Sequence, residues 1–568
     1  MEDLRCLEDS LVAQVDQAKL MEYTSNIAKW IRVSGTQGEI ESLLYCQELL
    51  DQMGYTTKLS RHPGFISIPV RSSLEVISPE HMSFDAITHP FVPSTPFCGL
   101  KRDIVLESFP AVAGKIVLAD GLPEPEKVQM LEDMGAAGVV FVQDDHLHNM
   151  QLSPLWGSPT EKTEGLMIHI PVVSIVRSDG QKLKDLIAKG TVLVCMESVV
   201  DTGWKEIPLL EAEIKAKDSD RFVLFSSHID SWDYGAMDNG AANATLLECA
   251  RVLSQKRNKW QRGLRLALWS GHSQGKFFGS SWYADNHFEE LEDNCVGHVY
   301  VDSTGGKNAD IIIEAPVMPQ TKQLAADVIK RQTGEEFLGK RIGHYADQSF
   351  FGVGLTSTFG TFSEQDALKD TDVISFKMGD TKRAGGLGWW WHTSEDTLDK
   401  IDPKLLVRDT KVYVGVIWRI LCEPVLPYDF RALVAEIKDT VVDLCSKLEG
   451  RFDLSPVVQR VAQLEAKVNA FYLRVSDVTA PGDEAKKIES LMLRLSQLLV
   501  RISFHAENHF DFDLSGPMYP IPSLECGQAL ACCPQGSYRY HVLATELRRG
   551  TNRVMRHLRD AISLLDAY

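Results

Sequence analysis

The sequence lacks several features that would point to whole classes of protein. No run of about 18 apolar residues occurs in its 568 residues, so we expect no transmembrane helix. The first residues, Met1–Arg5, have neither the basic nor the apolar region of a signal peptide. Positive charge is not in excess, and a formal net charge of −19 argues against nucleic acid or an anionic membrane as partner. We therefore expect a protein that binds neither nucleic acid nor membranes.

A disulfide framework is missing as well. The 11 cysteines are scattered, with Cys532 and Cys533 as the close pair, and no Cys-x-x-Cys motif occurs. Such usage is typical of reduced thiols and predicts a cytoplasmic protein. Apolar residues make up 44% of the chain and charged residues 24%, which is a globular composition, and the length predicts more than one domain.

Apolar runs alternate with helical patterns through much of the chain. Between residues 206 and 424, continuous apolar runs predict strands covered on both faces, near 222–225, 264–269 and 296–301. A smaller α/β unit is predicted from about 71 to 205, and because it holds no clustered ligand motif we expect no chemistry there.

The last region, from about residue 425 to 568, is predicted to be helical. It contains three apolar stripes with helical spacing, which begin at Leu433, Val461 and Ile488. Such stripes indicate packing within a helical bundle or a dimer interface, and the two can coexist.

Metal-binding side chains gather at the ends of the predicted strands. His228 and Asp302 follow two of the apolar runs, and Gln274 lies just after a third. Open α/β sheets bind ligands at the carboxyl ends of their strands, so we expect one shared site. Asp238 and His392 complete the set, and imidazole and carboxylate groups are zinc ligands. The sequence therefore predicts a divalent metal centre, with zinc as the first candidate.

These motifs resemble the zinc aminopeptidase family that includes glutamate carboxypeptidase and the transferrin receptor. The likeness lies in His228-x-Asp230, Met237-Asp238-Asn239-Gly240-Ala241, the strand ending in Asp302, and His392-Thr393-x-x-Asp396-Thr397. It implies an α/β fold with a mixed, mostly parallel sheet flanked by helices. The metallopeptidase-like domain would be discontinuous, comprising 1–70 and 206–424, with a protease-associated α/β insert at 71–205 and a helical, dimerisation-like domain at 425–568.

The resemblance also implies roles for individual residues. Asp238 matches a carboxylate that bridges two metal ions, His228 and Asp302 match the other ligands of one ion, and His392 matches a ligand of the second. Asp230 matches an acid that orients a histidine ligand, and we include it among the catalytic residues. One or two Zn²⁺ ions per chain, or another divalent metal, are therefore expected.

One segment departs from the family. The family carries two glutamates, a general base and a metal ligand, shortly before a Gly-Ser pair, and counting back from Gly279-Ser280 those places hold Ser273 and Gln274. The neighbouring His272 could act as either base or ligand, because a neutral imidazole both accepts protons and binds zinc. We expect His272 to be catalytic, Gln274 to be a weak metal ligand and Ser273 to face the substrate.

The residues beside these motifs predict a pocket for a small peptide or amide. Three indoles directly before His392 suggest an aromatic wall, although at least one should be part of the core. These are Trp389, Trp390 and Trp391. His344, Asp347 and Gln348 lie where the family places substrate-facing groups.

The leading hypothesis is hydrolysis of a peptide or amide bond by metal-activated water, by an aminopeptidase, a carboxypeptidase or an amidase. The alternative is a catalytically degenerate binding scaffold, as in the transferrin receptor, and an aminoacyltransferase or cyclase on the same fold is a third hypothesis. A homodimer is expected from the helical region.

Overall fold

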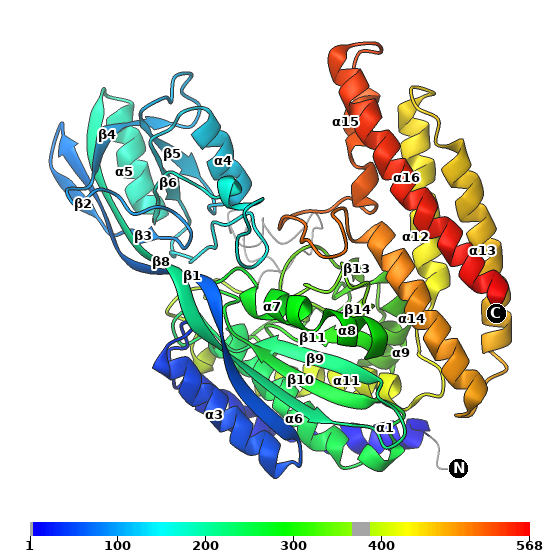
Figure 1. Ribbon diagram of the computed structural model, residues 1–568. Coiled ribbons are helices and arrows are strands. Elements are labelled where there is room, and N and C mark those ends of the chain that lie inside the picture. Colours follow the sequence, from blue (N-terminus) through cyan, green and yellow to red (C-terminus); the bar gives the residue numbers. More distant parts are fainter. Residues whose placement is uncertain (1–3, 366–386) are drawn as a thin grey trace.

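The computed structural model describes residues 4–365 and 387–568, which form three regions (Figure 1). A large α/β unit lies at the centre, a smaller α/β unit at one end and a helical region at the other. This arrangement confirms the predicted fold class. Within the described residues, every helix is too short or too polar to cross a lipid bilayer.

The central sheet is built around three parallel strands. They are β9 (Phe222–His228), β10 (Gly263–Trp269) and β11 (Cys295–Tyr300), in the spatial order β11-β9-β10. Every residue of these strands is buried, which explains their continuous apolar character. Three short strands extend the sheet beyond β11: β14 (Ser357–Thr358), β12 (Pro316–Val317) and β13 (Lys340–Arg341).

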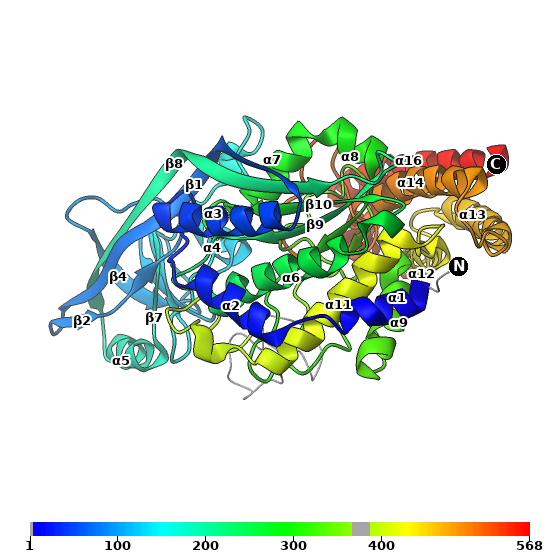
Figure 2. The ribbon, with the colours of Figure 1, turned by 90° about the horizontal axis from the view of Figure 1, so that it is seen from below.

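Helices cover both faces of this sheet (Figure 2). On one face lie α1 (Leu4–Val12), α2 (Gln17–Ala28), α3 (Gln37–Gln52), α6 (Ala242–Ser254), α9 (Lys322–Thr333) and α11 (Pro403–Cys422). On the other lie α7 (Phe278–Asn286) and α8 (Phe288–Asn294). Two of these helices start at an aspartate whose side chain accepts backbone N–H groups of the first turn, Asp16 for α2 and Asp402 for α11.

Two long strands connect the α/β units. β1 (Thr56–Ser78) and β8 (Val192–Ile214) pair antiparallel along almost their whole length and continue from one unit into the other. The smaller unit adds β2 (Met82–Phe84), β3 (Ile87–Thr88), β4 (Leu100–Leu106), β5 (Ile116–Asp120), β6 (Gly138–Val142), β7 (Val172–Ile175), α4 (Pro125–Asp133) and α5 (Arg177–Ile187). The boundaries expected near residues 70 and 205 therefore fall inside strands, and one sheet runs through both units.

The helical region consists of long helices that pack on one another. They are α12 (Phe430–Leu448), α13 (Ser455–Val475), α14 (Asp483–Ser503) and α16 (Tyr538–Ala567), with the short α15 (Cys526–Cys532). The stripes of α12 and α13 are buried inside this bundle, as Leu444 and Leu464 illustrate. Because these stripes pack within one chain, they give no support to a dimer, which stays a prediction.

Candidate metal centre

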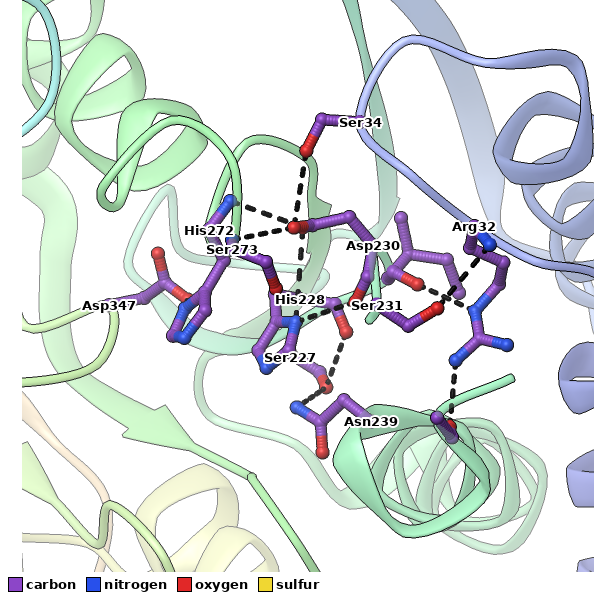
Figure 3. Close-up of polar contacts among 12 residues, drawn as sticks. Arg32, Ser34, Ser227, His228, Asp230, Ser231, Asn239, His272, Ser273 and Asp347 are labelled. Carbon is purple, nitrogen blue, oxygen red and sulfur yellow. Dashed lines mark hydrogen bonds and ion pairs between the residues drawn. The ribbon is translucent and has the colours of Figure 1, made fainter. Parts of the chain in front are cut away.

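The predicted site lies at the carboxyl ends of the parallel strands, and Figure 3 shows the part of it around His228, Asp230 and His272. His228 is the last residue of β9, the segment 270–275 follows β10, and Asp302 lies just after β11. The structure brings them together with Asp238 and His392, and all four predicted histidine and aspartate ligands are buried.

Asp238 lies between two histidines. Its Oδ1 is 3.2 Å from Nε2 of His228, and its Oδ2 is 3.1 Å from Nε2 of His392. Oδ2 of Asp302 lies 3.6 Å from the same nitrogen of His228. One carboxylate therefore presents an oxygen to each of two imidazoles, which is the arrangement needed to bridge two metal positions.

Both imidazoles are oriented through their other ring nitrogen. Nδ1 of His228 donates to the backbone carbonyl of Asp230 at 3.0 Å, and Nδ1 of His392 donates to that of Asn149 at 2.6 Å. In the neutral ring this leaves the lone pair on Nε2, as in ligating histidines. Nε2 of His228 is buried and makes no hydrogen bond with the described part of the chain. An unsatisfied nitrogen beside two carboxylates fits a divalent cation, and the donor set fits zinc.

Protons and cations compete for this cluster. Burial opposes the charged form of His228, but the carboxylates of Asp302 and Asp238 raise its pKa well above the ordinary value. Burial also opposes ionisation of Asp238, yet His228 and His392 hold the pKa of that carboxyl well below its usual range. A ligating imidazole must be neutral, so protonation of His228 and binding of a cation by this ring exclude each other.

The loop that carries Asp238 is held from two sides. Asp396 accepts hydrogen bonds from the backbone N–H groups of Met237 and Asp238, each at 2.9 Å. The fully buried Arg32 donates to three backbone carbonyls at 2.7 to 2.8 Å, those of Ile229, Tyr234 and Gly235. Asp396 belongs to a motif recognised in the sequence, whereas no pattern in the sequence identified Arg32.

Asp230 anchors the segment that departs from the family. Its Oδ1 accepts from the backbone N–H of His272 at 3.2 Å, and its Oδ2 accepts from that of Ser273 at 2.7 Å. Oδ2 also lies 3.2 Å from Oγ of Ser34, which makes its shorter contact with Gln274. The carboxylate lies 3.8 Å from Nδ1 of His228, whose hydrogen bond goes to the backbone oxygen of Asp230 instead. Asp230 therefore orients His228 through its main chain and uses its carboxylate to shape the loop.

The structure places His272 inside the cluster. Its ring stacks on that of His228, with centroids 3.8 Å apart and an interplanar angle of 11°. Its Nδ1 lies 2.8 Å from Oδ2 of Asp347, a fully buried carboxylate. One ligand atom from each of His228, His272 and Asp302 lies within 4.8 Å of the others.

Gln274 is placed differently from the expectation of a metal ligand. Its amide oxygen accepts from the backbone N–H and from Oγ of Ser34, at 3.0 and 2.7 Å. Its amide nitrogen donates to the carbonyl of Ser231 at 3.3 Å. Both lone pairs of the amide oxygen are used, so the predicted ligand role has no free donor position in this conformation. Ser273 is buried, and its backbone N–H is bound to Asp230.

The three indoles before His392 have different environments. Trp390 is buried in the core, as expected for at least one of them. Trp391 stacks on His392 with centroids 3.5 Å apart, and Trp389 stacks on His146 at 4.4 Å. Trp391 and Trp389 are partly exposed and remain the candidates for substrate contact.

The smaller α/β unit contributes directly to the site, contrary to the expectation from sequence. Besides accepting from His392, Asn149 donates its backbone N–H to the His392 carbonyl at 3.0 Å. Nδ1 of His148 donates to the carbonyl of Trp391, and Nε2 of Gln151 donates to that of His272, both at 2.6 Å. Most of these contacts involve backbone carbonyls, so side-chain patterns could not reveal them.

Imidazoles and carboxylates gathered at the ends of parallel strands are a donor set that suits a divalent metal in an α/β protein. Residues 210–417 match peptidase family M28, and residues 87–183 match the PA domain. The chain therefore carries an M28 peptidase domain together with a PA domain, which confirms the family suggested by the motifs.

Curated relatives and solved structures agree with this assignment. A probable glutamate carboxypeptidase of Zea mays is 25% identical over 238 residues, which are 40% of this chain and 32% of that protein. An aminopeptidase of Rattus norvegicus is 29% identical over 206 residues, 33% of this chain and 27% of that one. The chain thus spans about 30% of the length of these relatives. A zinc aminopeptidase from Bacillus subtilis has the same fold, with a TM-score of 0.54 at 19% identity over 72% of this chain and 95% of that one.

Proposed function

We propose that this protein hydrolyses a peptide or amide bond with the help of a divalent metal, zinc being the first candidate. The observation that carries the proposal is the Asp238 carboxylate, whose two oxygens face Nε2 of His228 and of His392 at 3.2 and 3.1 Å. The M28 match over 210–417 includes all four predicted histidine and aspartate ligands and supports peptidase chemistry. Aminopeptidase, carboxypeptidase and amidase activities all remain candidates for the reaction.

The residues are arranged to hold one or two ions. A divalent ion in this centre would lower the pKa of an attacking water and polarise the scissile carbonyl. His228, Asp238 and Asp302 would bind one ion, while Asp238 and His392 would bind a second. The hydrogen bonds on Nδ1 fix both imidazoles before binding, which reduces the reorganisation that the reaction requires.

A proton acceptor for the attacking water is also required. The sequence offers His272, Asp230 and Glu395 for this role. Asp230 uses both carboxylate oxygens for hydrogen bonds to the backbone of the loop after β10. His272 keeps one ring nitrogen available, because its other nitrogen is bound to Asp347. Hydrolysis should therefore depend on His272, either as a base or as a ligand that shapes the metal site.

The substrates are proposed to be small peptides or amides with an apolar or aromatic group. Trp391 supports this, because it is partly exposed and lies against His392. Trp389 extends the same aromatic surface toward His146 of the PA domain. Such surfaces bind apolar side chains while a few polar groups fix their orientation.

Metal analysis combined with a substrate panel tests the proposal. Purified protein should contain at least about one divalent ion per chain, and it should cleave an aminoacyl anilide, an N-acyl dipeptide or a simple amide. Asp238→Asn keeps the shape of the side chain but removes the bridging charge, so it should lose metal and activity together. Asp201→Asn is the matched control, because Asp201 is 61% exposed and pairs with Lys205 on the surface of β8.

The scaffold alternative makes the opposite prediction. Protein that takes up no metal on dialysis against Zn²⁺, and cleaves none of the substrates, would contradict the hydrolase and favour a binding role. An acyl transferase or cyclase would bind metal but release no hydrolysis product, so product analysis separates that case.

We also propose an oligomeric state and a cellular location for the protein. We propose a homodimer on the weak family resemblance of residues 425–568, and light scattering at micromolar concentration measures it. A cytoplasmic, reducing location is proposed because all 11 cysteines are free thiols in the structure. Thiol titration of protein prepared under a blocking reagent would reveal any disulfide.

A further inference from the structure

Three histidines of the site share one hydrogen-bonding pattern. In His228, His272 and His392, Nδ1 lies 3.0, 2.8 and 2.6 Å from an oxygen of the protein. In each neutral ring the lone pair is then left on Nε2. Two of the three are predicted ligands, and the same pattern is what a ligating histidine needs, because the partner on Nδ1 fixes the tautomer and the ring orientation.

The partner of His272 is the most strongly held of the three. Oδ2 of Asp347 accepts from His272 and lies 3.0 Å from the hydroxyl of Tyr300, while Oδ1 accepts from Oγ of Ser280 at 2.6 Å. Asp347 has no solvent exposure, so its charge requires these donors. A carboxylate bound to the far nitrogen of an imidazole raises the basicity of the near nitrogen as a ligand.

His272 is close to two predicted ligands. One donor atom from each of His228, His272 and Asp302 falls within 4.8 Å of the other two. In a tetrahedral zinc site with bonds of about 2.0 to 2.1 Å, neighbouring ligand atoms are about 3.3 Å apart. The rings of His228 and His272 are stacked nearly parallel, so His272 must turn out of this stack for its Nε2 to face an ion held by His228 and Asp302.

We propose that His272 is a ligand of the ion held by His228 and Asp302, and that Asp347 is the positioning residue that orients it. This inference rests on the proposed metal centre and specifies its ligands. An imidazole then adds a ligand where the family's anionic ligand is replaced by Gln274. The resulting set is richer in nitrogen, which favours zinc and similar transition metals over Mg²⁺ or Mn²⁺.

Metal binding, measured independently of activity, tests the inference. The affinity for Zn²⁺ is measured by competition with a chelator, and coordinated imidazoles are counted by pulsed electron paramagnetic resonance after loading less than one Cu²⁺ per chain. His272→Ala should weaken zinc binding and show one coordinated imidazole fewer than the wild type. Asp347→Asn should retain the imidazole but weaken zinc binding about 10- to 100-fold, as expected for loss of an orienting partner.

Two further variants provide a control for loss of a histidine outside the site and a rescue experiment in case His272→Ala does not fold. His541→Ala removes an exposed histidine of α16 and should leave both readouts at the wild-type level. If His272→Ala does not fold, His272→Gly with added imidazole provides a rescue experiment, in which imidazole restores the affinity for zinc.

The two proposals fail in different ways. Wild-type zinc affinity and an unchanged imidazole count in His272→Ala would overturn the ligand role, and loss of hydrolysis alone in that variant would identify His272 as the base. Failure of the hydrolase proposal would appear instead as wild-type protein that binds Zn²⁺ with His272 as a ligand but cleaves none of the substrates.

Discussion

The Asp230 carboxylate should be an anchor for the loop after β10, and Asp230→Asn tests this. The carboxylate accepts two backbone N–H groups, from His272 at 3.2 Å and from Ser273 at 2.7 Å, and it is completely buried. An asparagine has one oxygen at this position, so its NH₂ group would face one of these donors. A buried N–H without an acceptor costs about 1 to 3 kcal/mol, and a hydrogen bond to a charged acceptor contributes about 1.5 to 3 kcal/mol.

The destabilisation caused by Asp230→Asn depends on how many of these hydrogen bonds the single oxygen of asparagine can accept. Asparagine can retain one of the two backbone hydrogen bonds, so we expect local opening of the loop to become easier by about 2 to 3 kcal/mol. That corresponds to a roughly 30- to 150-fold loss of protection against amide hydrogen exchange at His272 and Ser273. Affinity for Zn²⁺ should fall in parallel, because the same loop carries His272.

Hydrogen exchange measured by mass spectrometry on peptides covering residues 266–280 gives the result, with Asp201→Asn as the surface control. Unchanged protection in Asp230→Asn would refute the anchor role. If hydrolysis were lost at the same time, Asp230 would act in the chemistry, as the family resemblance first suggested.

Two more outcomes follow from buried groups away from the site. Burial lowers the pKa of His89 in the PA domain to about 3, so the neutral ring contributes stability above the unfolded value of about 6.5, which is lost as the pH falls toward 3. Urea unfolding should show a loss of about 2 kcal/mol at pH 5 relative to pH 7.5, and His89→Gln should abolish that slope. Arg262 is buried, pairs with Glu489 of α14 and donates to the carbonyls of Ile420 and Glu423 at 2.9 and 2.7 Å. Arg262→Met should destabilise the contact between the helical region and the central unit by about 3 to 5 kcal/mol, whereas an unchanged unfolding midpoint would show that the pair contributes nothing.

The central sheet could be predicted from the sequence because each of its parallel strands has a pattern within its own few residues. Each of β9, β10 and β11 is a continuous apolar run, and parallel strands buried on both faces produce that pattern. Since ligands collect at the carboxyl ends of such strands, the sequence could also place His228 and Asp302 in one site. The full length of β1 (Thr56–Ser78) is not evident from the sequence. Pro63, Gly64 and Pro69 obscure its pattern, and prolines are tolerated there because this part of β1 is an edge strand.

Other parts of the site depend on contacts that have no sequence signature. The oxygen that orients His392 is a backbone carbonyl at Asn149, 243 residues earlier in the chain. Gln274 was expected to bind metal, but its orientation is set by Ser34 in another part of the chain. The helical stripes show the same limit, because an apolar face such as that of Leu444 looks identical whether it packs within one chain or against a second copy.

The replacement of the family's two glutamates by Ser273 and Gln274 also affects how many ions the site can hold. Asp238 and Asp302 are the carboxylates that face Nε2 of His228. The charge of Asp230, beside Nδ1, is engaged by backbone N–H groups, and that of Asp347 by its hydrogen bond to His272. Two carboxylates balance one dication, but a second dication would add an uncompensated buried charge, which is strongly unfavourable. We therefore propose one tightly held ion near His228 and a weaker position near His392. The zinc titration of the wild type measures this directly, since two equally tight sites would show that other groups supply the missing negative charge.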